Sequence, residues 1–159
     1  MDVQLINPFI EATINVLTTM ARITPQASAP QLKVDNRTWG IVTGVIGMAG
    51  DKVSGNLCVS FDKESALEIV GNMFGEPFTA INEEIVDAVG EITNMITGGT
   101  KKLLAEKGYK FEMATPMMIK GRDVELRFLG GSPVIQVPFA TSKGKFVVEA
   151  NLVPNRKDR

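Results

Sequence analysis

Three polar residues of a single predicted helix have the types and spacing that could support chemistry. They are Asp87, Glu91 and Asn94. At 100° per residue, counted from Asp87, Glu91 falls at about 40° and Asn94 at about −20°, so the three side chains form one polar stripe. The apolar residues of this helix fall at about 140–200°, on the opposite face: Ile85, Val89, Ile92, Ile96 and Leu103. Because the apolar face must be buried, the polar stripe is predicted to face outward.

Two glycines lie beside this stripe. Gly90 and Gly98 fall at about −60° and 20° on the same wheel, although glycine inside a helix costs roughly 0.5–1 kcal/mol relative to alanine. They would lower the surface there and let another macromolecule approach the helix backbone. An ordinary solvated helix face is the alternative interpretation, and wheel geometry alone favours it.

The polar stripe lacks the groups of a self-sufficient active site. The amide of Asn94 is neither a useful base nor a nucleophile, but it can hold a water molecule through hydrogen bonds. One exposed carboxylate can pair with a cation, yet it is too few for an enclosed Mg²⁺ or Ca²⁺ site. The set becomes catalytic only if a partner brings the metal, the electrophile and the charge stabilisation. Phosphoryl transfer is a reaction that two proteins could share in this way, because positioning and electrostatics carry most of its catalysis.

Composition excludes several other classes of function. The 159 residues contain no histidine, which removes imidazole catalysis and every histidine-containing zinc site. Seventeen basic against eighteen acidic residues give no cationic excess for nucleic acid. The one cysteine, Cys58, fits a reducing compartment. No apolar run approaches the ~20 residues of a membrane span, so we expect a cytoplasmic protein with no membrane or nucleic-acid partner.

The first half of the chain predicts a helix, a hairpin and a second helix. Asn7 and Pro8 are typical of a helix start, and helical spacing continues to about Ala21. Residues 38–61 favour a β-hairpin turning at 49–52, whose glycines we interpret as strand-packing residues. A short helix should follow, capped by Asp62 and running through Met73.

The second half predicts a long helix and then strands. Asn82 should cap the helix, with Lys101 and Lys102 towards its end where they favour the helix dipole, while the Gly98–Gly99 pair could interrupt it. Alternating residues predict strands at 124–128, 135–139 and 146–150, with a turn at 130–133. Pro138 places its strand at an edge or a bulge.

Each half therefore opens with a helix and continues into antiparallel strands. This order predicts an α+β fold with an internal αββ pseudo-repeat, in which an antiparallel sheet packs with two long helices. We expect one domain over 1–154 and a frayed tail over 155–159.

The residues quoted above also resemble a known family. Asp87-x3-Glu91-x2-Asn94, followed after 21 residues by Pro116, is similar to the signature of the CheC/CheX/FliY phosphatases of bacterial chemotaxis. Four longer segments resemble the CheX branch in the same order along nearly the whole chain: INPFIEATINVL, VIGMAGDKVSGNLCVSF, VGEITNMITGG and IKGRDVEL.

The resemblance implies a CheC-like fold and hydrolysis of the aspartyl phosphate on the response regulator CheY. Glu91 would anchor a lysine of CheY, and Asn94 would hold the attacking water, so these two are the candidate catalytic residues. Asp87, Gly90, Gly98 and Pro116 are candidate partner-binding residues. The Mg²⁺ would belong to the phosphorylated site of the partner, with no cofactor or metal bound by this chain.

The resemblance also implies a homodimer with one active centre per chain. The first helix carries Glu11-x3-Asn15, one residue longer than the motif, and this moves the amide about 100° around the helix. We therefore expect no second site there.

Two other functions remain open. The same helix face could serve a non-enzymatic module that binds a receiver domain or a flagellar component. A small-molecule sensor with a pocket between the two halves is a third possibility, although no residue pattern specifies its ligand.

Overall fold

The chain folds around one antiparallel sheet. The computed structural model describes residues 3–128 and 133–155. Four long strands form the centre in the order β7–β8–β4–β3. Their bounds are β3 (Val42–Gly50), β4 (Val53–Phe61), β7 (Ile135–Ala140) and β8 (Lys145–Pro154). Short strands extend both sides: β1 (Gln26–Ala27) and β2 (Gln31–Leu32) pair with β7, while β5 (Phe111–Met113) and β6 (Met117–Lys120) pair with β3.

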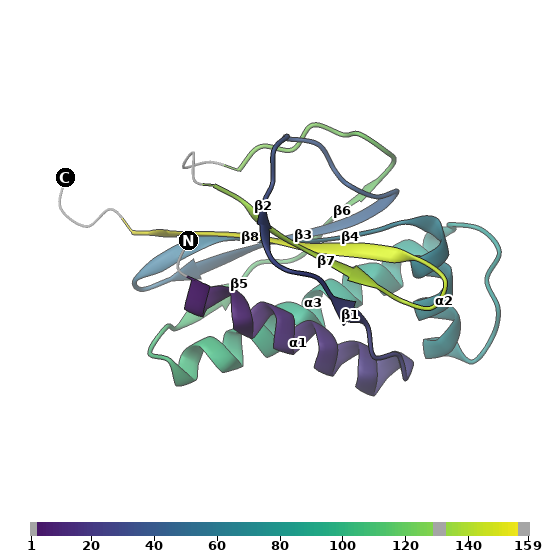
Figure 1. Cartoon of the computed structure of the whole chain (residues 1–159), viewed down its shortest axis with the longest axis horizontal. Coiled ribbons are helices and arrows are strands. Elements are labelled where there is room, and N and C mark those ends of the chain that lie inside the picture. Colours follow the sequence, from purple (N-terminus) through teal and green to yellow (C-terminus); the bar gives the residue numbers. More distant parts are fainter. Residues whose placement is uncertain (1–2, 129–132, 156–159) are drawn as a thin grey trace.

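Helices cover one face of the sheet. The long helices α1 (Val3–Ala21) and α3 (Glu83–Glu106) lie side by side beneath it, and the shorter α2 (Lys63–Phe74) lies at one end (Figure 1). The opposite face is crossed by the connections that follow β2 and β6 (Figure 1). Within the described residues, neither long helix has the sustained hydropathy needed to cross a bilayer. A cytoplasmic location stays a prediction.

The two predicted halves meet along the centre of the sheet. Hairpin β3–β4 and hairpin β7–β8 join through antiparallel pairing of β4 with β8, over the full register from Val53–Pro154 to Phe61–Phe146. One long helix precedes each half. The predicted α+β fold is confirmed, with α2 as a third helix whose cap, Asp62, accepts a hydrogen bond from Ser65 N as expected.

The start of the first helix was predicted wrongly. The helix already includes Val3, so Asn7 is not its cap and Pro8 lies inside it. Leu5 and Ile6 are buried in the core, and burial of two such side chains contributes about 3–6 kcal/mol. This equals or exceeds the roughly 3 kcal/mol that an interior proline costs, so the helix extends past the sequence signal.

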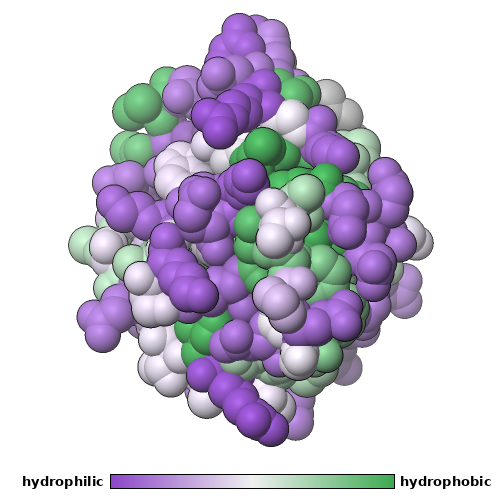
Figure 2. Space-filling model, turned by 90° about the vertical axis from the view of Figure 1, so that its right-hand side faces the viewer, coloured by the Kyte–Doolittle hydropathy of each residue, from purple (hydrophilic) through white to green (hydrophobic). Residues whose placement is uncertain are grey.

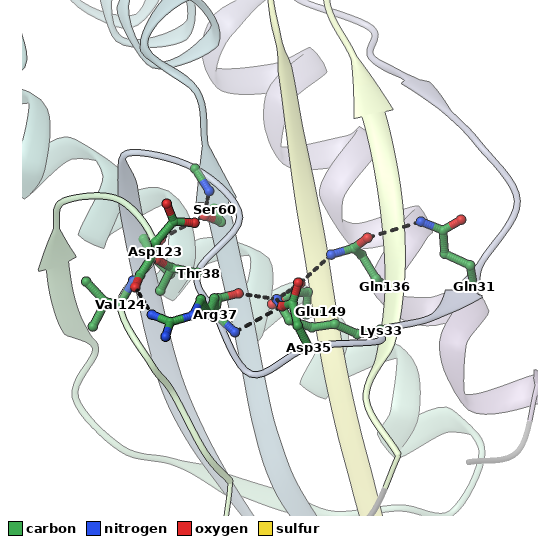
Figure 3. Close-up of polar contacts among 12 residues, drawn as sticks. Gln31, Lys33, Asp35, Arg37, Thr38, Ser60, Asp123, Val124, Gln136 and Glu149 are labelled. Carbon is green, nitrogen blue, oxygen red and sulfur yellow. Dashed lines mark hydrogen bonds and ion pairs between the residues drawn. The ribbon is translucent and has the colours of Figure 1, made fainter.

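The prediction of a strand at residues 124–128 is also wrong. Its only ladder contact is an isolated bridge between Glu125 and Arg37, and Val124 is exposed. The reason is that β5 and β6, which the sequence did not predict, already occupy the edge of β3. The segment instead lies over the sheet, where Arg37 donates to the Asp123 carbonyl over 2.6 Å (Figure 3).

Pro138 lies opposite the gap between β1 and β2, so it sits at a partly open edge as predicted. Asn155 is not frayed, because its side chain donates to the Gly50 carbonyl and accepts from Ser54. Residues 130–132 of the predicted turn and 156–159 of the predicted tail lie outside the described residues.

A buried ion pair holds the connection after β2 against the sheet. Lys33 Nζ lies 2.7 Å from Glu149 Oε2 and donates to the Arg37 carbonyl, while Gln136 donates to the same carboxylate (Figure 3). Burial raises the pKa of the neighbouring Cys58 thiol well above its usual range, and the Glu149 carboxylate raises it further. Cys58 is therefore held as an unreactive thiol.

We expect Gly44→Ala to destabilise the protein, because a Cβ at Gly44 of β3 would overlap the Thr93 hydroxyl of α3. Overpacking of this kind costs about 1–3 kcal/mol. Urea unfolding followed by circular dichroism measures the free energy. Gly47→Ala on the same strand is the matched control, since its Cβ would have no neighbour closer than 3.8 Å. Equal stabilities of the two variants would contradict the proposed contact.

Candidate functional site

The polar stripe lies on α3, which its ends and its packing hold in one orientation. The Asn82 side chain accepts a hydrogen bond from Ile85 N over 3.0 Å and caps the helix as predicted. The helix is continuous through Gly98 and Gly99, so the pair does not interrupt it. Gly99 faces α1, where a Cβ would lie 3.2 Å from that of Ala12.

The buried face of α3 decides which residues face the solvent. Four of the five apolar residues that the wheel placed on this face are completely buried: Ile85, Val89, Ile92 and Ile96. The fifth, Leu103, is only half-buried. Thr93 is buried against Gly44 and donates to the Val89 carbonyl over 2.8 Å. Since the helix cannot rotate without breaking these contacts, the polar stripe must point away from the sheet.

The stripe residues lie on the face that the wheel predicted, although Asn94 is less exposed than expected. Asp87 and Glu91 are exposed, and Asn94 is half-buried. Among the described residues, none forms a hydrogen bond or an ion pair with any of these three side chains. The amide of Asn94 therefore keeps its donors and acceptor available for a group from outside the chain.

The two glycines differ in their surroundings. A Cβ at Gly98 would meet nothing within 4 Å, so this position is open surface. At Gly90 a Cβ would lie 3.2 Å from the sulfur of Met118 in β6, so the small size of Gly90 also serves packing. Pro116 stands just before β6 and is half-buried, so its segment borders the Gly90 side of the stripe.

Met118 is the residue of this region that sequence reasoning missed. Its contact with Gly90 joins residues that are 28 positions apart, and it depends on β6 pairing with β3. Neither the short strand nor the pairing has a local signal, because residues 117–120 show no clear alternation.

Two other surfaces bear on the possibilities of a second active centre and of a small-molecule pocket. Glu11 and Asn15 are exposed on α1, as expected of ordinary polar helix residues. A hollow of about 700 Å³ lies at the α2 end of the molecule, lined in part by Arg22, Glu68 and Phe78 but by no residue of the stripe. The face at that end is largely hydrophilic around a limited hydrophobic area (Figure 2).

In the described part of the chain, no three acidic or cysteine side chains gather as a metal site would require.

The comparison with protein families gives a match over more than half of the chain. The family described as "Chemotaxis phosphatase CheX" matches residues 42–140, a range that includes the polar stripe and Pro116. The chain belongs to this CheX family. The match does not include α1, so it leaves Glu11 and Asn15 outside the shared region.

Individual relatives agree with the family. The CheY-P phosphatase CheX of Thermotoga maritima is 27% identical over 131 residues, which cover 82% of this chain and 84% of that protein. A CheC-like superfamily protein from Shewanella sp. PV-4 is 41% identical and has a TM-score of 0.89, covering 96% of this chain and 99% of that chain. A chain of the CheX–CheY–BeF3–Mg²⁺ complex of Borrelia burgdorferi is 25% identical, with a TM-score of 0.79 over 95% of this CheX family member and 99% of that chain.

We expect Gly98→Ala to stabilise this CheX family member by up to about 1 kcal/mol, because alanine is the better helix former and the added methyl group meets no neighbour. Thermal and urea unfolding measure the change. Gly99→Ala is the control on the adjacent position, where Ala12 crowds the new methyl group and the gain should be smaller or negative. A Gly98→Ala variant less stable than the wild type would contradict the open surface at this position.

Proposed function

We propose that this chain accelerates hydrolysis of the aspartyl phosphate on a CheY-type response regulator. The observation that carries the proposal is the amide of Asn94, which has no hydrogen-bond partner among the described residues and lies one turn from the exposed Glu91. The family description and the name of the Thermotoga maritima relative, a CheY-P phosphatase, support it.

Asn94 acts by position in this proposal. Its amide oxygen accepts a hydrogen bond from a water molecule and holds it in line with the phosphorus atom of the partner. The water oxygen bonds to phosphorus while the bond between phosphorus and the aspartyl oxygen breaks, which releases inorganic phosphate and a free carboxylate. Since Asn94 takes up no proton, its contribution is geometric.

Glu91 anchors the partner. Its exposed carboxylate pairs with a lysine of the response regulator, and a charge pair at an interface acts mainly on association and specificity. Asp87 lies one turn earlier and adds negative charge to the same surface. The open position at Gly98 lets the partner approach the helix, and Pro116 shapes the bordering segment.

The metal of this reaction belongs to the partner in our proposal. Mg²⁺ in phosphoryl-transfer sites is held by carboxylates together with substrate phosphates, and among the described residues of this chain no three acidic or cysteine side chains gather to hold a metal ion. The Borrelia burgdorferi complex pairs CheX with CheY, BeF3 and Mg²⁺, and its composition supports this assignment.

Replacing Asn94 should chiefly lower the rate of hydrolysis. We expect Asn94→Ala to reduce kcat about 100-fold, because misplacing a reacting group costs on that order, and to leave KM nearly unchanged. The measurement is loss of phosphate from a phosphorylated CheY-type regulator mixed with the protein. Asn15→Ala is the matched control, since it removes an exposed amide from the other long helix.

Replacing Glu91 should chiefly weaken association. We expect Glu91→Ala to raise KM, because an ion pair with the partner is lost. If Glu91→Ala and Asn94→Ala both retain the wild-type acceleration, the proposed mechanism is wrong. Binding of the phosphorylated regulator without any change in phosphate lifetime would instead identify a non-enzymatic binding module.

We also propose that the chain forms a homodimer, as the family resemblance implies. The sheet ends in short strands on both sides, and Met117 of β6 is 53% exposed. Analytical ultracentrifugation should give about twice the 17.2 kDa of one chain. A single species at the mass of one chain across micromolar concentrations would contradict the dimer.

A further inference from the structure

Lys101 and Lys102 of α3 are not explained by the helix dipole. We expected them to stabilise the end of the helix, but α3 continues to Glu106 and has no basic residue in its last turn. The dipole acts on charges within the last turn, so the two lysines lie too early to benefit from it.

Both lysines continue the polar stripe instead. On the wheel counted from Asp87 they fall at about −40° and 60°, on either side of Gly98 at about 20°. Lys101 is half-buried and Lys102 is exposed. Neither forms an ion pair with another residue that the structure describes. The helix thus presents two unpaired cations on the same side as Asn94.

The surface between the amide and the cations is clear. Lys101 lies seven positions after Asn94, which is about 10 Å along the helix axis. Gly98 lies between them, and a side chain there would meet no neighbour. A partner seated over Asn94 therefore meets no side chain at Gly98, the position between the amide and the two lysines.

Charge along the stripe changes sign at Asn94. Glu83, Glu84, Asp87 and Glu91 precede it, whereas Lys101 and Lys102 follow it. A phosphorylated aspartate with its metal is surrounded by acidic groups, because Mg²⁺ is held by carboxylates together with phosphate oxygens. The acidic half suits a lysine of the partner, and the basic half suits these acidic groups.

We propose that Lys101 and Lys102 bind the acidic surface around the phosphorylated aspartate of the response regulator and so set the orientation in which it docks. The inference rests on the proposed phosphatase function and adds a specificity-determining pair to it. The two lysines lie about 10–12 Å from Asn94 along the helix axis, which is comparable to the Debye length of about 10 Å at 0.1 M salt. They should therefore act on association, in a salt-dependent manner, and not on the chemical step.

The test compares two double variants of equal charge. Lys101→Gln/Lys102→Gln removes both cations from the stripe and keeps most of each aliphatic stem. Lys63→Gln/Lys107→Gln removes two exposed cations elsewhere, at the start of α2 and just beyond α3, and is the matched control. Hydrolysis of the phosphorylated regulator is measured at 50 mM and 500 mM salt, and circular dichroism confirms that both variants fold.

We expect the stripe variant to raise KM about 5–10-fold at 50 mM salt, with kcat within twofold of the wild type, since charge steering changes association over that range or more. At 500 mM salt the difference should nearly vanish, and the control should match the wild type throughout. A KM equal to that of the control, or a fall in kcat at unchanged KM, would overturn the inference.

Failure of the proposed function is distinguishable from failure of this inference. A wild-type protein that does not accelerate hydrolysis would overturn the phosphatase proposal alone. Fluorescence anisotropy with labelled phosphorylated regulator then tests the lysines by affinity. Weaker binding of the stripe variant at low salt supports their role, and binding equal to that of the control overturns it.

Discussion

The close approach of α3 to the sheet is the constraint on which the rest of the structure depends. Gly44 of β3 leaves space for Thr93, and Gly99 lies close to Ala12 of α1, so α3 packs closely on two sides: a methyl group at Gly44 would overlap Thr93, and one at Gly99 would be crowded. A helix that is packed this closely cannot rotate by a small step without clashes in the core. Because packing fixes the orientation of α3 about its axis, it also fixes which side of the helix faces the solvent. Asp87, Glu91 and Asn94 lie on that side.

This arrangement explains how a chain without histidine, in whose described residues no metal-binding cluster gathers, can belong to a phosphatase family. The protein contributes a rigid helix that presents a carboxylate and an amide, and in our proposal the partner contributes the phosphoryl group and the Mg²⁺. Positioning is the part of phosphoryl transfer that a preorganised surface supplies best. The stiffness of α3 is then a functional property as well as a structural one.

Where sequence reasoning failed, a contact distant in the sequence decided the outcome. Residues 124–128 alternate as a strand does, yet β5 and β6 already pair with the edge that they would need. Asn7 and Pro8 form a good start signal, yet burial of Leu5 and Ile6 outweighs it. Lys101 and Lys102 were expected to favour the helix dipole, yet α3 ends at Glu106 and both lysines lie before its last turn.

The sequence by itself determined the type of each major element, the pairing of the two hairpin strands 42–61, the caps Asp62 and Asn82, and the sharing of one helix face by Glu91 and Asn94. These features are local, because they follow from helical and strand periodicity and from side chains that bond within three residues. Only the tertiary structure decided which strands border β3, that Met118 packs against Gly90, and that Gly98 is open while Gly99 is crowded. Such features depend on the distance between segments far apart in the chain, and no local pattern records that distance.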